Sequence, residues 1–245
     1  MPVREVIRPN RTERRRGKSD PIDAYPAARA AAAGQDLPIP KLIGGQVDGV
    51  RALLRARGSA VKATTAAINR IKAMLVTAEP AVREAYEPLG NQQLIAKLAA
   101  TRPKRTEPVR VALRRLARRA QYLTEDAAEA ETELADLIQG IAPALSKTHG
   151  IGTLSVAQLL VTAGENPERI KSLAAFAALT SVSPIPASSA KTTRYRLNRG
   201  GGRQANAALQ RTALMRMSTE DNRTRDYIAK KRTGRQINRR GNAVP

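Results

Sequence analysis

Two long blocks of the sequence repeat apolar residues at helical spacing, and this pattern constrains the fold more than any other feature. In the first block, residues 46–78, aliphatic side chains recur every three, four or seven positions with Arg and Lys between them. The recurring residues are Val47, Val50, Leu53, Leu54, Val61, Ile68, Ile71 and Leu75. The second block covers residues 107–141, after a break that contains Pro and Gly. The two blocks predict an antiparallel helical hairpin or a coiled-coil-like arm.

The second block changes the sign of its charge along its length. It opens basic, with Arg110, Arg114, Arg115, Arg118 and Arg119. It ends acidic, with Glu125, Asp126, Glu129, Glu131, Glu133 and Asp136. Pairing of two copies would bring opposite charges together, so we expect a homo-oligomer, either a dimer or a tetramer. A solvated helix face is the alternative interpretation.

The composition limits both the core and the chemistry. The 245 residues include no Trp, no Cys, one Phe and one His, so the core is aliphatic, and disulfides, thiolate sites and most His-based triads are excluded. The net charge of +22, from 43 Lys and Arg against 21 Asp and Glu, indicates a polyanionic partner, DNA or RNA. No apolar run approaches the roughly 20 residues of a membrane span, so we expect a cytoplasmic protein without a membrane partner.

The chain divides into four segments by texture, and the expected fold class is mainly α. Residues 1–40 offer a short strand at 3–7 and an Ala-rich helix, which cannot bury their own apolar faces and so predict a remnant of a larger α/β domain. Residues 41–142 form the helical arm. Residues 143–220 predict a compact helical domain, and residues 221–245 a basic, frayed tail.

One glycine turn has the form of a helix-hairpin-helix element. His149 is followed by Gly150, Ile151, Gly152 and Thr153, and then by an apolar helix. The glycines allow a tight turn close to a phosphate, and the helix N-terminus offers free N–H donors to it. Such contacts hold a nucleic-acid backbone without reading its sequence. The alternative is an ordinary helix cap and turn.

Two further groups of polar residues are candidates for chemistry. Asp20 and Asp23 lie three residues apart, which places them on one helix face. They are either metal ligands or capping acids, with Asp20 as the N-cap, Pro21 as the first helical residue and Asp23 in the first turn. Ser188 and Ser189 precede a cluster of cations that would clamp a phosphate and stabilise its transition-state charge. The cluster comprises Lys191, Arg194, Arg196, Arg199 and Arg203. A flexible Ser/Thr loop beside a basic strand is the alternative.

Three separated segments together resemble one known family. They read GKSDPIDAYPAARAA (17–31), THGIGTLSVAQLLVTAG (148–164) and SSAKTTRYRLNRGGGRQANAAL (188–209). In this order they resemble the insertion-sequence transposases that join an N-terminal DEDD, RuvC-like nuclease domain to a C-terminal serine domain. Piv-type invertases and bridge-RNA-guided recombinases are relatives of that family.

The resemblance implies a mechanism and a set of site residues. It implies that Ser189, or else Ser188, attacks a DNA phosphodiester to form a phosphoserine intermediate. Asp20 and Asp23 match the last two of the family's four acids, which hold a divalent metal such as Mg²⁺. It also places Arg203, Gln204 and Asn206 near the phosphate. A structured noncoding RNA is an implied partner beside DNA.

The sequence also departs from the family pattern. The first two acids have no counterpart here, and the C-terminal end differs, so we expect a truncated, catalytically impaired chain. Pro26 falls where a helix should continue, and Ala190 replaces a glycine after the serines. The alternative function is a non-catalytic DNA- or RNA-binding remnant that associates with intact transposase. A ribosomal-type RNA-binding protein is a further alternative suggested by charge alone.

Overall fold

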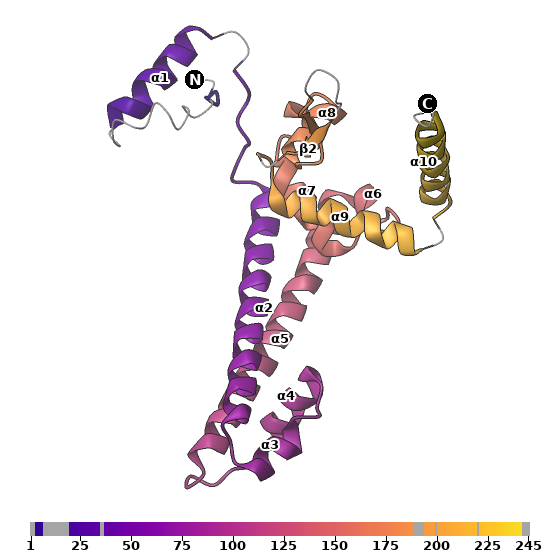
Figure 1. Ribbon diagram of the computed structural model, residues 1–245. Coiled ribbons are helices and arrows are strands. Elements are labelled where there is room, and N and C mark those ends of the chain that lie inside the picture. The colour runs from indigo at the N-terminus through magenta and orange to yellow at the C-terminus, as the bar shows by residue number, and fades with distance from the viewer. Residues whose placement is uncertain are drawn as a thin grey trace.

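A computed structural model of the chain describes residues 3–6, 20–34, 37–188, 194–198, 200–219 and 221–241. The described residues are mainly helical, as predicted, and their strands form a single two-stranded sheet. Figure 1 shows a long two-helix arm that extends from a smaller helical body. Within the described residues no helix is both long enough and apolar enough to cross a membrane.

The arm consists of helices α2 (Gln46–Val76) and α5 (Pro108–Ile141), which pack against each other along their length. This confirms the two helical blocks of the sequence. Pro108 occupies the first turn of α5, where its missing N–H costs no hydrogen bond. One ion pair crosses between the helices, from Arg57 Nε to Glu131 Oε2 at 2.9 Å. A helix of 34 residues spans about 50 Å.

Two short helices close the distal end of the arm. Helix α3 (Pro80–Tyr86) and helix α4 (Asn91–Ala100) fill the break between the long blocks, and α4 packs on α5. Their apolar residues join a cluster that includes both long helices. Its buried members are Ile71, Leu75, Val82, Leu94, Leu98, Leu113 and Ala117. The arm therefore has its own hydrophobic core at the tip.

The body lies at the other end of the arm. It contains helices α6 (Pro143–Ser146), α7 (Thr153–Ala163), η2 (Pro167–Arg169), α8 (Leu173–Leu179) and α9 (Arg203–Ser218). Helix α7 contacts α9 and the ends of both arm helices. A second core cluster holds this junction together, made of Val50, Leu134, Ile138, Val156 and Ala157. Because α2 and α5 contribute to it, the arm is fixed to the body by apolar burial.

The N-terminal segment differs from expectation in two ways. Residues 3–6 form no strand: their one backbone hydrogen bond within the described residues joins the Glu5 N–H to the Pro38 carbonyl at 2.9 Å, and Ile7, the last residue of the expected strand, lies outside the described residues. Helix α1 (Asp20–Ala32) continues through Pro26, which was expected to interrupt it. Proline removes one N–H bond, and the Ala-rich residues after it have the highest helix propensity.

The C-terminal segment, expected to fray, forms helix α10 (Asn222–Gly241). The reason lies just before its first turn. Asp221 accepts hydrogen bonds from the Thr224 N–H at 3.1 Å and from Arg216 Nη2 at 2.9 Å. A carboxylate in that place satisfies an otherwise free N–H group and suits the helix dipole.

Candidate functional site

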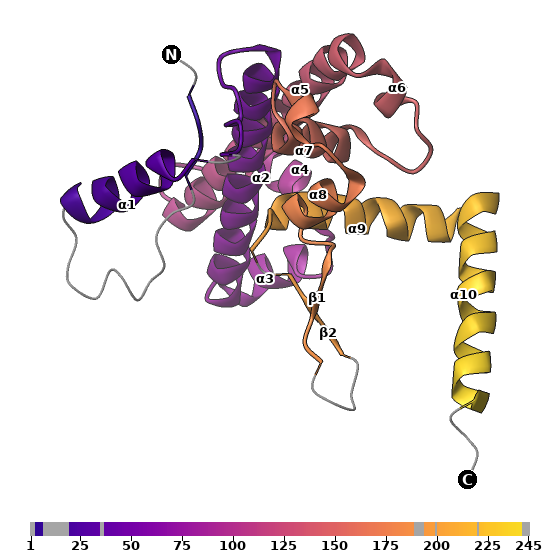
Figure 2. The same cartoon turned by 90° about the horizontal axis from the view of Figure 1, so that it is seen from above.

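A β-hairpin carries the predicted serine loop. Strands β1 (Pro184–Pro186) and β2 (Tyr195–Leu197) pair antiparallel, with Ile185 opposite Arg196. Figure 2 shows the hairpin projecting from the body between α8 and α9. The pairing continues past the strands, because the Ala187 N–H donates to the Arg194 carbonyl at 2.8 Å. The paired residues 184–187 and 194–197 therefore form a short stalk.

Ser188 lies where the stalk ends. Its Oγ accepts a hydrogen bond from the Arg194 N–H at 3.2 Å, and its side chain is exposed. Ser189, with Ala190 and Lys191, lies outside the described residues. Ser188 therefore has a structural partner that closes the hairpin.

The predicted cations divide between the hairpin and the start of α9. Arg194, just before β2, and Arg196, within β2, are exposed. Arg203 and Gln204 are exposed in the first turn of α9. Arg199 lies outside the described residues. A phosphate that approaches the hairpin would meet Arg194 and Arg196 without first displacing a protein carboxylate, because none of the ion pairs found among described residues involves them.

A close backbone contact anchors the hairpin to the body. Gly201 lies against Ser181, so that a Cβ atom built on Gly201 would be 2.5 Å from Ser181 Oγ and 2.6 Å from the Ala178 carbonyl oxygen. The next residue, Gly202, donates its N–H to the Leu179 carbonyl at 2.8 Å. Ser181 is buried and has a φ of 61°. Only a glycine fits at position 201, because any side chain would meet backbone atoms.

Asn206 and Asn198 support the same contact from the protein side. Asn206 Nδ2 donates to the Ser181 carbonyl at 3.3 Å, and Asn198 Nδ2 donates to the Ala178 carbonyl at 3.2 Å. Both asparagines thus tie the returning strand and α9 to the end of α8. Asn206, which the sequence suggested for phosphate contact, holds the protein backbone in this structure.

The glycine turn lies between α6 and α7, at the base of the body. Gly150 has a φ of 80°, and Gly152 caps α7, with Thr153 as its first residue. Ile151 packs against the core at the arm junction, so the turn is held by its own apolar residue. This arrangement leaves the first N–H groups of α7 outside the helix hydrogen-bond pattern.

The turn is fastened to the end of α9. His149 Nε2 lies 2.9 Å from Thr219 Oγ1, and the aliphatic part of Arg216 covers Gly150. Arg216 in turn pairs with Asp221. Hydrogen bonding from the Thr224 hydroxyl, and then from Arg216, lowers the pKa of Asp221 below its usual value. Side-chain contacts therefore connect the turn, α9 and the start of α10.

Comparison with known families matches both ends of the chain. Residues 142–229 match a family described as "Transposase IS116/IS110/IS902 family", and residues 1–80 match the DEDD transposase domain of IS110 elements. The chain carries transposase domains. No curated protein matches the sequence significantly. The IS116/IS110/IS902 match contains the glycine turn, the serine hairpin and α9, and the DEDD match contains α1 and all of α2.

The DEDD segment holds the two predicted acids. Asp20 and Asp23 lie in the first turn of α1, three residues apart, and their side chains lie outside the described part of the structure. Among described residues, no three His, Asp or Glu side chains gather as metal ligands. Figures 1 and 2 both show α1 on the opposite side of α2 from the serine hairpin. Within one chain, α1 and the strands of the hairpin are therefore not brought together.

A buried asparagine joins the two transposase segments, although no sequence motif singled it out. Asn166 is 4% exposed; its Nδ2 donates to the Pro40 carbonyl, and its Oδ1 accepts from the Leu42 N–H, both at 3.0 Å. With these two bonds the side-chain amide of Asn166 pairs with the backbone of Pro40 and Leu42 as a neighbouring β-strand would. They bind residues 37–45, the strap that leads into α2, to the body.

Two charged residues add to the strap contact. Glu165 accepts a hydrogen bond from the Val47 N–H at the start of α2, and Lys41 Nζ donates to the Val161 carbonyl. Burial, and then the charges of Arg51 and Arg169, lower the pKa of Lys41. The sequence signal was a polar pair directly after the Gly164 end of α7, a pattern shared with ordinary loops.

Proposed function

We propose that this transposase-domain chain cuts and joins DNA through a phosphoserine intermediate, with the serine loop of the β-hairpin as its nucleophilic element. The observation that supports this proposal is the hairpin itself. Its two strands project from the body, and it holds Arg194 and Arg196 exposed close in sequence to the serines. Cations placed beside a nucleophile are what phosphoryl transfer requires from a protein.

Ser189 is the proposed nucleophile, and Ser188 is the second candidate. Ser188 Oγ already accepts a hydrogen bond from the Arg194 backbone, which gives it a role in closing the stalk. In the proposed step, the serine oxygen attacks phosphorus, the bond from phosphorus to one deoxyribose oxygen breaks, and the serine proton leaves to solvent while the leaving oxygen takes a proton. Attack by another DNA hydroxyl on the phosphoserine reverses the sequence and joins strands without an external energy source.

The exposed residues around the hairpin would bind the scissile phosphate. In this proposal Arg194, Arg196 and Arg203 contact phosphate oxygens, together with Lys191 and Arg199 of the loop. Gln204 would add a neutral donor from the first turn of α9. Asn206 would act indirectly, because its amide holds the Ser181 carbonyl.

The glycine turn would provide a second grip on the DNA backbone. We propose that residues 147–163 act as a helix-hairpin-helix element in which Gly150, Ile151, Gly152 and Thr153 approach a phosphate. The supporting features are the positive φ of Gly150 and the free N–H groups at the start of α7. Such a contact positions DNA without reading its sequence.

The acids fit only part of a metal site. Asp20 and Asp23 supply two carboxylates from one turn of α1, and phosphoryl transfer with two metal ions generally collects more ligands than this. We expect the complete site to combine elements of more than one chain, since α1 and the hairpin lie on different sides of α2.

Suicide-substrate trapping tests the proposal. The full chain would be mixed with nicked DNA that carries the element's ends, in Mg²⁺ and with the adjacent transcribed RNA. The expected result is a denaturation-resistant protein–DNA adduct that Ser189→Ala abolishes and Ser188→Ala only reduces. Loss of the adduct in Ser188→Ala but not in Ser189→Ala would identify Ser188 as the nucleophile. An adduct that survives the double substitution would refute the serine mechanism.

A second candidate function is binding without chemistry. The net charge of +22 favours it, because that charge binds nucleic acid whether or not the site is complete. Salt-sensitive binding without an adduct, under conditions where an intact relative forms one, would support a binding protein that associates with intact transposase. A structured noncoding RNA and a homo-oligomer are further proposed partners, tested by co-purification and by mass measurement in solution.

A further inference from the structure

The distal end of the arm carries a concentration of positive charge that the proposed function does not use. Between residues 62 and 119 there are 13 Lys and Arg against four Glu, a net charge of +9. Residues 81–141, which include most of this region, lie outside both matched transposase domains. The charge is therefore a property of the arm and not of the matched domains.

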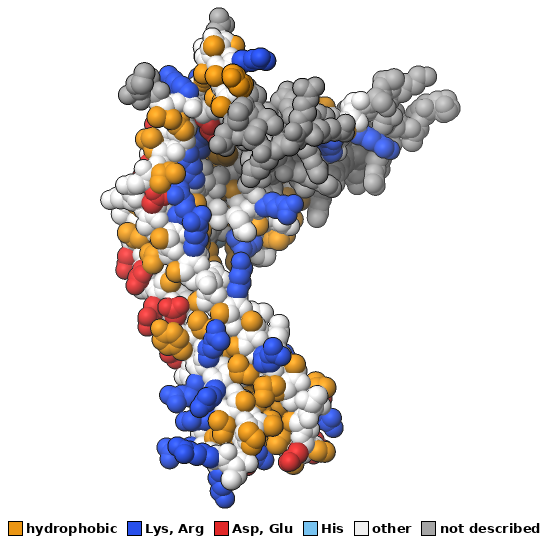
Figure 3. Space-filling view, turned by 90° about the vertical axis from the view of Figure 1, so that its left-hand side faces the viewer, with side chains coloured by type: hydrophobic (Ala, Val, Ile, Leu, Met, Phe, Trp, Pro, Cys, Tyr) orange, Lys and Arg blue, Asp and Glu red, His pale blue; other side chains and the backbone are white. Residues whose placement is uncertain are grey.

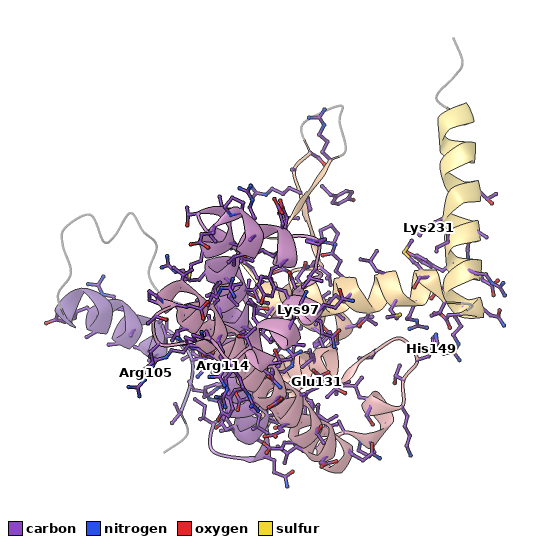
Figure 4. The ribbon with its side chains drawn as sticks, turned by 90° about the horizontal axis from the view of Figure 1, so that it is seen from below. Lys97, Arg105, Arg114, Glu131, His149 and Lys231 are labelled. Atoms are coloured by element: carbon purple, nitrogen blue, oxygen red, sulfur yellow. The ribbon has the colours of Figure 1, made fainter. Side chains whose placement is uncertain are left out.

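The densest part of this charge lies on α5 and the loop before it, and we call these residues the distal basic surface. They are Arg102, Lys104, Arg105, Arg110, Arg114, Arg115, Arg118 and Arg119. Seven of the eight are exposed, and Arg114 is half-buried. In Figure 4 the labelled Arg105 points away from the arm. Figure 3 shows blue side chains at this lower end of the arm and a red group of acids higher up.

Acidic side chains of the chain neutralise little of the positive charge on the distal basic surface. The one ion pair of these residues within the described part of the chain joins Arg110 Nε to Glu107 Oε1 at 3.5 Å. Arg110, Arg114 and Arg118 follow each other at four-residue intervals, as do Arg115 and Arg119, and like charges at that spacing destabilise a helix. Arg114 Nε is buried and has no hydrogen-bond partner among the described residues. A bound polyanion would relieve the repulsion between these cations.

The chemistry of the surface favours a duplex backbone over single-stranded bases. Single strands are held by aromatic side chains on which bases stack. The whole chain has one Phe, five Tyr and no Trp; residues 102–119 contain none of these, and Tyr122 is the one aromatic residue of α5. A row of exposed guanidinium groups instead suits phosphate oxygens.

An acidic belt separates this surface from the body. Six acids and no cation lie on α5 between residues 121 and 141. From the centre of the distal basic surface to the end of α5 is about 40 Å of helix. A duplex that followed the arm to the hairpin would face these carboxylates, so contact at the tip and contact at the hairpin involve separate duplex segments.

We infer that the distal basic surface of the arm is a second nucleic-acid site, which binds the phosphate backbone of a duplex segment remote from the serine hairpin. The inference goes beyond the proposed function and does not need its chemistry. A Ser189→Ala protein is expected to bind at this surface as the natural chain does.

Salt-dependent binding provides the first test. The triple variant R115Q/R118Q/R119Q would be compared with R4Q/R55Q/K171Q, which removes the same charge from exposed positions outside the surface. Affinity of the full chain for a 30-base-pair duplex would be measured by fluorescence anisotropy at several salt concentrations. Three lost phosphate contacts make the slope of log K against log salt shallower by about 2–3. R115K/R118K/R119K keeps the charge and should restore the slope.

Equal slopes for the two triple variants would overturn the inference. The same measurement on duplex DNA and on duplex RNA of the same sequence identifies which nucleic acid the surface binds. It is the duplex for which the two triple variants differ more in their slope of log K against log salt. A change in oligomeric state without any change in slope would also overturn it, because the surface would then pair with the acidic belt of a second copy.

Tethered cleavage gives an independent test of position. The chain has no Cys, so one introduced Cys carries a unique label. Thr106→Cys places an iron chelate at the tip, and Thr132→Cys places it in the acidic belt; both positions are exposed. With bound duplex, the Thr106 label is expected to cut and the Thr132 label is not. Equal cutting from both positions, or cutting from Thr132 alone, would overturn the proposed separation.

Discussion

The close contact at Gly201 provides the sharpest prediction about the serine hairpin. In Gly201→Ala, the new methyl group would lie 2.5 Å from Ser181 Oγ, 2.6 Å from the Ala178 carbonyl oxygen and 2.7 Å from the Ser181 nitrogen. Two of these three atoms belong to the backbone and cannot rotate away. Either the turn or the end of α8 must shift, and overpacking of this kind costs about 1–3 kcal/mol.

Gly202→Ala is the matched control. Its methyl group would meet only ordinary contacts, at 3.6 Å from the Leu179 carbonyl oxygen and 3.7 Å from Ala205 Cβ. Both substitutions restrict the unfolded chain equally, by about 0.4–1 kcal/mol, so this gain cancels in the comparison. The difference in the free energy of unfolding between the two variants therefore reports the close contact.

Thermal unfolding followed by circular dichroism measures this difference. For a chain of this size, 1 kcal/mol corresponds to about 2–4 °C, so Gly201→Ala is expected to melt about 2–12 °C below Gly202→Ala. Amide exchange should become faster in residues 178–206 of Gly201→Ala. The phosphoserine adduct should be lost in that variant and retained in Gly202→Ala. Equal melting temperatures would refute the reasoning that the anchor depends on backbone approach at position 201.

Three further predictions concern the rest of the fold. Asn166→Ala leaves the Pro40 carbonyl and the Leu42 N–H without their partner, which costs about 1–3 kcal/mol. Amide exchange in residues 37–45 should therefore become faster in this variant and stay unchanged in the exposed-site control Glu168→Ala. Unchanged exchange in Asn166→Ala would contradict the strap contact. Leu134→Ala removes a fully buried side chain of the arm junction and should cost about 2–5 kcal/mol, whereas Leu137→Ala, at a position 37% exposed, should cost much less; chemical unfolding measures both. The pKa of Asp221 is lowered in the folded chain, so its stabilising effect is present above its unfolded value and is lost as pH falls. The melting temperature of Asp221→Asn should therefore lie below that of the natural chain at pH 7 and approach it at pH 3, and a gap that does not narrow would show that the titration of Asp221 is not responsible.

The local parts of the fold followed from the sequence. Apolar spacing predicted both arm helices, and the expected start of the second, residue 107, lies one residue before α5 begins. The turn before α7 was predicted from its glycines. These features depend on residues that are close together in the sequence, so local sequence patterns are enough to predict them.

The sequence also predicted part of the candidate site. It singled out the serines, the cations and the aspartates as residue types suited to phosphoryl transfer. It did not reveal that Ser188 closes the hairpin through Arg194, or that Asn206 holds Ser181. These partners lie six and 25 residues apart, and no short motif links them.

What only the tertiary structure decided was which distant segments meet. The strap at Pro40 to Leu42 binds Asn166, more than 120 residues later, and the spacing of polar residues in a loop gives no sign of such a partner. Likewise, the sequence placed the acidic and serine segments in one order, but the long rigid arm helix between them sets α1 and the hairpin apart in space. Periodicity fixes local helices because their hydrogen bonds are local, whereas the meeting of distant segments depends on complementary shape and on buried polar groups that find partners only in the folded chain.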